Sequence, residues 1–176
     1  GLHQGTYYPI GGFHEIIVAL SKLAKEKGVA INYNSVVNKI AVSNNEADHL
    51  IVNGKKLEFD GVVAAADYHH VEQVLLDKKY RNYNNEYWEK REMAPSSLLF
   101  YVGVDKKLEN IHHHNLFFDE DFDQHAKEIY DEPNWPKNPL FYLSCPSITD
   151  TTVAPKGEEN LMFLIPLAPG LQDNNE

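Results

Sequence analysis

The spacing of apolar residues directly after Gly12 places the strongest constraint on how this chain folds. From residue 13 to residue 24 they recur three or four positions apart, which predicts an amphipathic helix with one buried stripe (Phe13, Ile16, Ile17, Leu20, Leu23 and Ala24). Gly28 is a natural stop for this helix. The first predicted element is therefore a helix that begins at a glycine pair.

The glycines ahead of the helix, in "GTYYPIGGFHEII", raise the alternative of a phosphate-binding loop. A dinucleotide-binding fold requires G-x-G-x-x-G after a strand, and a P-loop requires Lys and then Ser or Thr after its last glycine. Here Phe13 and His14 follow Gly11 and Gly12. We therefore interpret the glycines as a tight turn that starts the helix.

Extended segments dominate the next stretch of the sequence. Asn53-Gly54 separates two short extended runs and is the strongest local hairpin signal in the chain. The runs 29–34 and 36–43 also read as strands. The small and branched residues of 60–67 predict a strand buried on both faces, as in a parallel sheet. A short helix is predicted over 68–76.

The composition changes between residues 77 and 93, where tyrosines and charged residues replace the apolar runs. This change predicts a domain boundary near residue 77. Beyond it, Phe122, Ala126 and Ile129 form a helical stripe that acidic residues precede. The predicted fold class is α/β or α+β, with strands and a helix of one domain before a mixed or antiparallel sheet of a second. The strands predicted for that sheet are 96–104, 139–145 and 160–167.

Charge and composition exclude several classes of function. The 176 residues include 16 Lys and Arg against 26 Asp and Glu, for a formal net charge of −10. Nucleic-acid surfaces need clustered cations, and no basic cluster appears, so we expect no nucleic-acid partner. The single cysteine, Cys145, excludes an internal disulfide framework and favours the cytoplasm. The apolar runs are shorter than the ~20 residues of a membrane span, and no signal peptide is recognised.

Three stretches carry residue types that metal or catalytic sites use, and each favours a structural interpretation. Adjacent histidines in 112–114 point to alternate sides of an extended segment and do not easily converge on one ion. The aspartates of 119–123 resemble a calcium loop, but Gln124 and Tyr130 occupy the positions that need Gly and Glu. Cys145 lies in an apolar run, as a small buried side chain does. We predict no metal site and no catalytic residue.

Five phrases, read in order, cover nearly the whole chain: "GTYYPIGGFHEIIVALSKLAKEKGV", "NYNSVVNKI", "FDGVVAAADYHHVEQVLL", "PSSLLFYVGVDKKLENIHHHNLFF" and "FYLSCPSITDTTVAPKGEENLMFLIP". Together they resemble the bacterial phytoene desaturases, a carotenoid-forming branch of the flavin amine-oxidase superfamily. The most specific parts are "HHNLFF" and the pattern PS-x-TD…AP-x-G, which here comprises Pro146, Ser147, Thr149, Asp150, Ala154, Pro155 and Gly157.

The resemblance implies that the sequence is the central part of a longer enzyme. Members of the family begin with a dinucleotide-binding βαβ unit and end with a second glycine-rich segment that contacts flavin. Neither has a counterpart in this sequence. By position, residues 1–76 correspond to the central part of the FAD-binding domain, and residues 77–176 correspond to part of the substrate-binding domain.

The resemblance also implies where the cofactor FAD makes contact. In the family, a V-x-x-I motif offers the backbone N–H and C=O of its valine to the adenine ring, and this motif matches Val37 to Ile40. Val36 is the alternative. Ala64 and Ala65 are expected to pass under the adenosine end, where small side chains allow close approach. Core packing is the alternative interpretation for these residues. FAD is expected in the full-length parent and not to be held by this fragment.

The activity that the resemblance implies is dehydrogenation of a long apolar polyene, such as phytoene, with a hydride passing to the flavin. The apolar strands of residues 98–104, 140–143 and 161–167 are expected to form one wall of its channel. Two alternatives stay open. One is a non-catalytic module that binds an apolar ligand or a protein. The other is a related flavin oxidoreductase, similar to retinoid saturases or amine oxidases, with another apolar substrate.

A polyene of this kind lies in the bilayer, so the resemblance implies a cytoplasmic protein that associates peripherally with the inner face of the membrane. No basic amphipathic helix for this task is visible in the sequence. Strand edges and apolar faces that the fragment leaves uncovered also lead us to expect self-association.

Overall fold

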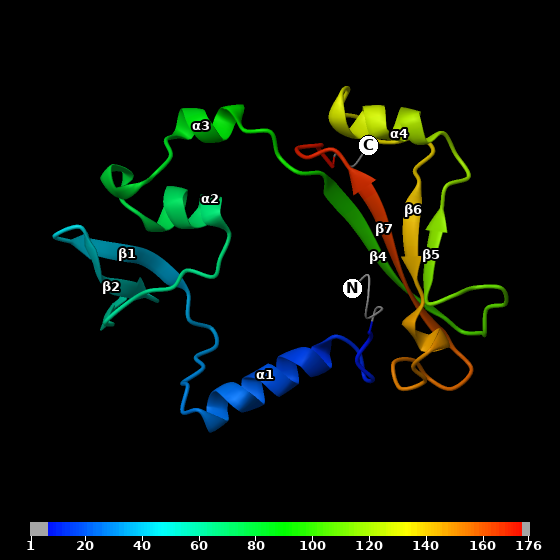
Figure 1. Cartoon of the computed structure of the whole chain (residues 1–176), viewed down its shortest axis with the longest axis horizontal. Helices are drawn as coiled ribbons and strands as arrows, with labels where there is room; N and C mark the ends of the chain where they lie inside the picture. Colours follow the sequence, from blue (N-terminus) through cyan, green and yellow to red (C-terminus); the bar gives the residue numbers. More distant parts are fainter. Residues whose placement is uncertain (1–6, 174–176) are drawn as a thin grey trace. The chain divides into compact units, whose positions relative to one another are not determined.

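A computed structural model describes residues 7–173 of the chain. The chain divides into two compact units. Residues 30–92 form one of them, and the described residues on either side of that stretch form the other (Figure 1). The unit made from both ends of the chain is called the sheet unit below, and the unit of residues 30–92 is called the hairpin unit.

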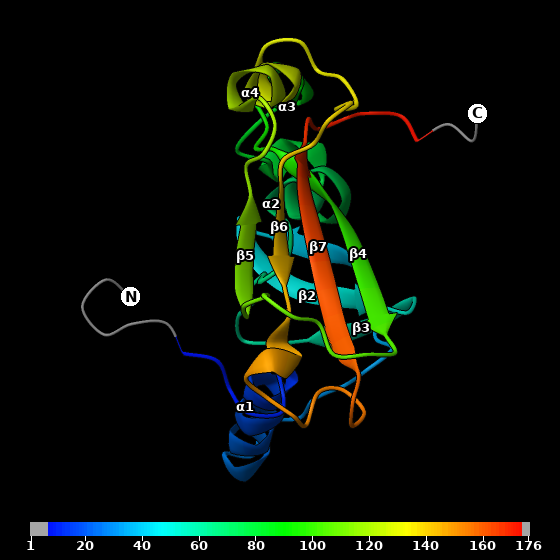
Figure 2. The same cartoon turned by 90° about the vertical axis from the view of Figure 1, so that its right-hand side faces the viewer.

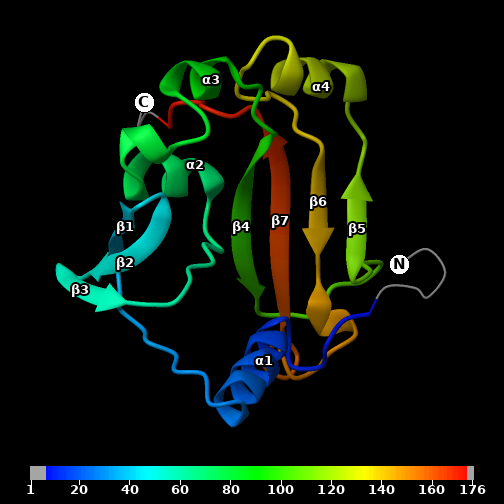
Figure 3. The same ribbon diagram turned by 60° about the vertical axis from the view of Figure 1, so that its left-hand side comes forward.

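The sheet unit is built on a four-stranded antiparallel sheet with the order β4-β7-β6-β5. Its helices are α1 (His14–Glu26) and α4 (Phe122–Tyr130), and the four strands are β4 (Ser96–Val104), β5 (His114–Phe117), β6 (Phe141–Ser144) and β7 (Glu159–Leu167). Figures 2 and 3 show α4 at one end of the sheet and α1 at the other. A single 3-10 turn (Pro146–Ile148) follows β6.

Register divides the side chains of this sheet between two faces. Tyr101 and Ser144 lie opposite Met162, whereas Phe100 and Leu143 lie opposite Phe163. Because successive side chains of a strand point to opposite faces, these two sets lie on different sides. We call the sides the Met162 face and the Phe163 face. The Phe163 face carries the main core of the unit, formed by Leu143, Cys145 and Leu161 with Val104, Leu108, Ile111, Phe141 and Phe163 packed against them.

The hairpin unit is a three-stranded antiparallel meander with short helical turns. Its strands are β1 (Val37–Ser43), β2 (Glu46–Val52) and β3 (Lys55–Glu58). They are followed by α2 (Tyr68–His70), a π-helical turn (Val71–Leu75), a 3-10 turn (Lys78–Tyr80) and α3 (Asn85–Lys90). The core consists of Ile40, Val71 and Leu75, so the turn after α2 closes one face of the meander.

Most predicted elements are confirmed, and with them the α/β class. α1 spans the predicted residues, and Gly28 ends it with φ 80°. The Asn53-Gly54 hairpin joins β2 and β3 with φ 48° and 76°, as a two-residue turn of type I′ requires. Cys145 is fully buried, as its sequence context predicted. Asp121 caps α4 through a hydrogen bond from the Gln124 N–H, so the acidic run does start a helix.

Two predicted strands are wrong. Residues 29–34 and 60–67 have no regular strand structure in the described chain. Both sheets are antiparallel, and among the described residues neither segment has a neighbouring strand with which to share a ladder. Since a strand exists only through hydrogen bonds to a partner, apolar composition alone does not make one.

The predicted burial of the α1 stripe is also wrong. None of the residues of α1 is buried. Phe13, Ile17 and Leu20 each expose more than half of their surface, because no described element packs on that side of the helix. The spacing of the apolar residues therefore predicted the helix correctly, but it wrongly predicted that their side chains are buried.

The predicted division of the parent enzyme at residues 76 and 77 stays a prediction. The compact units meet at residues 29–30 and 92–93 instead. α1 joins the sheet unit because the turn before it, residues 8–13, packs on the ends of the strands. We call this segment the 8–13 turn.

Candidate functional site

The four residues predicted to contact the cofactor lie around one cavity of the hairpin unit. Its volume is about 380 Å³, and Val36, Val37, Ala64 and Ala65 all line it. The rest of the lining is apolar apart from one histidine and consists of Ile40, Leu50, Val62, Val63, Ala66, His70, Val71 and Leu75. The structure therefore brings together residues that are almost thirty positions apart in sequence. That they contact a cofactor stays a prediction.

Asn53 holds the start of β1 in place beside this cavity. Its backbone N–H donates to the Val36 C=O at 2.9 Å, and its side-chain Oδ1 accepts from the Val36 N–H at 3.1 Å. The side-chain Nδ2–H of Asn53 also donates to the Asn34 C=O at 3.0 Å. Both backbone groups of Val36 are thus occupied within the chain, which leaves Val36 less suited than Val37 to a backbone contact with a ligand.

The backbone of Val37 faces the open edge of β1. Val37 lies opposite Val52, and the hydrogen bond between Asn53 and Val36 falls just beside this pair. In an antiparallel ladder such a pair is not hydrogen bonded, so its N–H and C=O groups point away from the partner strand. Among the described residues β1 has β2 as its neighbour on one side and no strand on the other. Val37 therefore offers a donor and an acceptor at an exposed edge.

Ala64 and Ala65 are exposed, and they lie in the segment that failed to form a strand. A flat aromatic ring can approach a backbone closely where side chains are small. The cavity thus combines small apolar walls with one edge that carries a free donor and acceptor. These features fit the adenine end of a dinucleotide cofactor.

The sheet unit carries a larger cavity, of about 510 Å³, on the Met162 face. Gly103, Ser144 and Met162 contribute from three adjacent strands, and the 8–13 turn closes one end with Tyr8 and Phe13. A β-carbon built on Gly103 meets no atom within 4 Å, so the absence of a side chain there keeps the cavity open. The remaining lining residues are Tyr101, Val102, Pro146, Asn160 and Leu161.

A buried carboxylate attaches the 8–13 turn to the sheet. Asp150 accepts the Gly11 N–H at 2.6 Å, and its other oxygen accepts the N–H and hydroxyl of Thr152 at 2.9 and 2.6 Å. The hydrogen bonds from Thr152, and then the one from Gly11, lower the pKa of Asp150. Burial, together with the charge of Asp150, raises the pKa of Tyr8, which keeps this phenol protonated. The Tyr8 ring packs edge-on against His113 at 4.8 Å between centroids.

A second carboxylate fixes the loop that carries Asp150. Glu159 is 2% exposed, and its side chain accepts the Ser147 hydroxyl. Lys107 Nζ lies 3.2 Å from its other oxygen. Burial raises the pKa of Glu159, but the hydrogen bonds from Ser147 and Lys107 outweigh this effect and leave the pKa below its usual value. The Ser147 hydroxyl also accepts the N–H of Asn160, so the start and the end of the loop between β6 and β7 are hydrogen bonded to each other.

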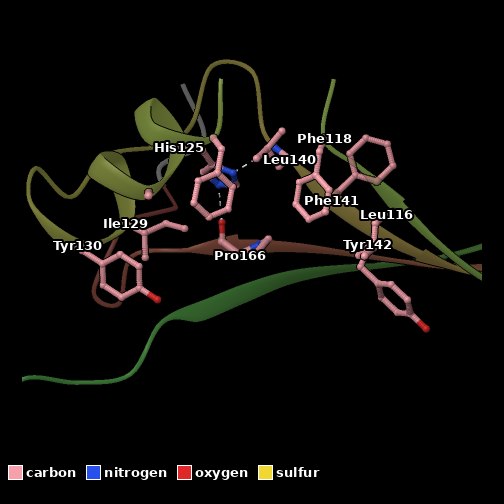
Figure 4. A pocket seen from close by; sticks show the side chains of 11 residues that line it. Leu116, Phe118, His125, Ile129, Tyr130, Leu140, Phe141, Tyr142 and Pro166 are labelled. Atoms are coloured by element: carbon pink, nitrogen blue, oxygen red, sulfur yellow. Dashed lines mark hydrogen bonds between the residues drawn. The ribbon is translucent and has the colours of Figure 1, made fainter. Parts of the chain in front are cut away.

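A smaller cavity, of about 240 Å³, lies beneath α4 (Figure 4). Leu116, Tyr142 and Pro166 contribute to its lining from three strands, and α4 lies over it. His125 of α4 is 4% exposed; its Nε2–H donates to the Pro166 C=O at 3.0 Å, and its Nδ1 accepts the Leu140 N–H at 3.1 Å. The other lining residues are Phe118, Phe122, Ala126, Ile129, Tyr130 and Phe141.

The two cavities of the sheet unit lie along one row of β7 side chains. Asn160 and Met162 line the larger cavity, and Pro166 lines the smaller one. Leu164 lies between them, opposite Leu99 and Tyr142. All of these residues lie on the Met162 face, and six residues of strand span about 20 Å. We call this surface the Met162 trough.

The histidine cluster and the cysteine make structural contacts. His113 pairs with the Thr149 hydroxyl and His114 with the Tyr142 hydroxyl, each at 2.6 Å. Within residues 7–173, no group of three or more His, Cys, Asp or Glu side chains is placed to hold a metal ion. Burial raises the pKa of the Cys145 thiol, which keeps it in its less reactive form.

Comparison with known protein families identifies the class of protein. Residues 1–164 match the family described as flavin containing amine oxidoreductase. The chain therefore belongs to this family, as the phrases in its sequence predicted.

Several relatives of this chain are named as carotenoid or phytoene desaturases. The chain is 41% identical over 174 residues to carotenoid 3,4-desaturase of Haloarcula japonica, an alignment that covers 98% of this chain and 35% of the relative. It is 31% identical to a 4,4'-diapophytoene desaturase of Staphylococcus haemolyticus, over 93% of this chain and 34% of the relative. With a zeta-carotene-forming phytoene desaturase of Myxococcus xanthus the identity is 30%, over 94% and 32%. The chain thus spans about a third of the length of these relatives.

Family membership implies FAD in the parent protein, and the hairpin unit fits one end of it. The exposed Val37 backbone and the small side chains of Ala64 and Ala65 suit an adenine ring. The described residues contain no G-x-G-x-x-G loop. Contacts to the pyrophosphate and the flavin ring are therefore not assigned to this chain.

The sequence led us to expect the strands that carry the Met162 trough as one wall of a channel, but it did not assign the residues that face it. Gly103 and Met162 gave no signal, because the faces of a strand that is apolar on both sides cannot be told apart by alternation. Asp150 stood in a family-specific phrase, but its hydrogen bond to Gly11 joins positions 139 residues apart. The one available signal was that Gly11 and Asp150 both lie in phrases that resemble the same family.

Proposed function

We propose that the protein to which this chain belongs is an FAD-dependent desaturase of a long apolar polyene, of the phytoene type. The Met162 trough carries this proposal. Its two cavities are lined mainly by aliphatic and aromatic side chains, and they follow one strand over about 20 Å. The names of the relatives, which are carotenoid and phytoene desaturases, support the same substrate class.

The trough would bind such a substrate through apolar area alone. A hydrocarbon offers no hydrogen-bonding group, and burial of apolar surface contributes about 25 cal/mol per Å². Tyr101, Leu164 and Met162 supply this surface along the Met162 face. Tyr101 is 77% exposed and Leu99 43%, so the surface is open to a ligand in the described chain.

This chain would bind and position the cofactor and the substrate. None of its described side chains is assigned a chemical step. When bound, FAD would accept the hydride that leaves one carbon of a saturated carbon–carbon bond, while the neighbouring carbon would lose a proton. The Val37 edge would hold the adenine end. Asp150 and Glu159 fix the loop and the 8–13 turn that close one end of the trough, and this closure would exclude water from the substrate.

We also propose that the protein is cytoplasmic and associates peripherally with the inner face of a membrane, where a polyene would be dissolved. No helix within residues 7–173 is long and apolar enough to cross a bilayer. Flotation of the full-length protein with liposomes tests this proposal. Recovery of all the protein in the unbound fraction would contradict it.

The experiment that tests the desaturase function is product analysis in cells that make phytoene. Expression of the full-length protein should convert phytoene into a more unsaturated, coloured product. Gly103→Leu, which fills the open space on the Met162 face, should lower the conversion rate at least about tenfold.

Ser96→Leu is the matched control, because Ser96 lies exposed opposite Leu167, on the other face of the same sheet. It should leave conversion unchanged. Accumulated phytoene in cells with abundant, flavin-containing wild-type protein would contradict the proposed function.

A further inference from the structure

The cavity beneath α4 offers a ligand almost no hydrogen-bonding group. Both ring nitrogens of His125 are occupied, one by the Pro166 C=O and the other by the Leu140 N–H. The Tyr142 hydroxyl pairs with His114 Nδ1. No charged side chain lines the cavity. His125 thus joins α4 to the sheet by two hydrogen bonds, and only the carbon atoms of its ring are left to contact a ligand.

Such a cavity selects hydrocarbon over water. The cavity is open to solvent, since Leu116, Phe118 and Phe122 each expose more than half of their surface. Its volume is about 240 Å³, and eight of its lining side chains are aliphatic or aromatic without a polar atom (Leu116, Phe118, Phe122, Ala126, Ile129, Leu140, Phe141 and Pro166). A hydrocarbon that enters it covers this apolar surface, which contributes about 25 cal/mol per Å². Its natural occupant is therefore an apolar group of limited bulk.

The position of the cavity indicates which part of a ligand reaches it. Pro166 lies on the same row as Met162, four residues or about 13 Å further along β7. Between them Leu99 and Tyr101 of the Met162 face are exposed, whereas α4 covers the Pro166 end (Figure 4). A linear ligand that lies along the trough therefore meets α4 with its end.

We propose that the cavity beneath α4 is an end-group site, which receives the hydrocarbon terminus of the polyene. This inference rests on the desaturase function proposed above. Ala126 is the small residue among the α4 side chains that line the cavity. Its size sets how far the terminus enters, so α4 selects substrates by length.

The test compares two substrates in the full-length, FAD-loaded protein: phytoene and the shorter 4,4'-diapophytoene. Ala126→Phe fills the cavity and should lower kcat/KM for phytoene at least about tenfold more than for 4,4'-diapophytoene. Gln124→Phe places the same side chain on the exposed side of α4 and should leave the ratio unchanged. Ile129→Ala enlarges the cavity and should shift the ratio toward phytoene, which provides a second reading if Ala126→Phe fails to fold.

The outcomes separate the two proposals. A wild-type protein that converts both substrates, with a ratio that Ala126→Phe and Ile129→Ala leave within about twofold, overturns the end-group site and keeps the desaturase function. A correctly folded, flavin-loaded wild-type protein that converts neither substrate overturns both.

Discussion

At the scale of single residues, backbone groups matter more than side chains for the proposed cofactor contact. Val37 offers an N–H and a C=O at an open strand edge, whereas the same groups of Val36 are bound by Asn53. A backbone contact of this kind is insensitive to most side-chain changes. Only a substitution that removes the backbone donor tests it.

Val37→Pro removes that donor. Because the N–H points away from β2, proline should be tolerated at this edge position. We expect FAD affinity of the full-length protein to fall roughly three- to tenfold, which corresponds to the loss of one hydrogen bond. Fluorescence titration of the apoprotein measures the change. Val37→Ala keeps the N–H and should bind FAD like the wild type; an equal loss in both variants would show that the side chain acts instead.

Asp150 gives the fold a dependence on acid pH. Its folded-state pKa is lowered, so its contribution to stability is present above the unfolded value, about pH 3.9, and is lost as the pH falls through the folded value. Asp150→Asn should therefore melt below the wild type near neutral pH. The difference should shrink below about pH 4. Thermal unfolding of both proteins over this range measures it, and a gap that stays constant in acid would contradict the role of the charge.

At the scale of elements, His125 affects both the stability of the fold and the proposed end-group site, because it hydrogen bonds α4 to the sheet. His125→Leu keeps the apolar volume but leaves the buried Leu140 N–H and Pro166 C=O without partners. We expect the free energy of unfolding to fall by about 2–6 kcal/mol, since each of the two groups costs about 1–3 kcal/mol. Urea unfolding measures this. His125→Gln can restore one of the two bonds and should lose less; equal losses would mean that packing, and not hydrogen bonding, holds α4.

The elements also show what the sequence could predict. Local signals were sufficient where the structure is local: the α1 period, the Asn53-Gly54 turn and the acidic cap of α4 are all confirmed. They failed where an element needs a distant partner. Residues 60–67 have strand composition but no ladder, and β5 was missed because its four residues are strand only through pairing with β6.

The candidate site divides in the same way. Val36, Val37, Ala64 and Ala65 were predicted from a family motif and do meet at one cavity. The strands of the Met162 trough were expected to form a channel wall, but the face that does so could not be predicted, because these strands are apolar on both faces and only their register assigns Met162 and Phe163 to opposite sides.

At the scale of the whole molecule, the described residues expose apolar surface that a monomer of this size rarely shows. Ile17 and Leu20 of the α1 stripe, and Phe100 on the Phe163 face, are all exposed. We propose that this surface is covered by further polypeptide of the parent protein. The 176-residue chain alone is then expected to self-associate.

The chain expressed alone should also retain no FAD after purification, since the residues proposed to contact it lie at the adenine end alone. Light scattering should show oligomers at micromolar concentration, and the absorption spectrum should lack a flavin band. A colourless preparation that remains monomeric would contradict the self-association, whereas a yellow preparation with bound flavin would contradict the division of the cofactor site.

The most direct measurement is an experimental structure of the full-length protein with FAD and a bound polyene. We predict an elongated ligand against Met162 and Leu164 with its end beneath α4, and an adenine ring hydrogen bonded to the Val37 backbone. A polyene bound elsewhere, with the Met162 face packed against protein, would contradict the account.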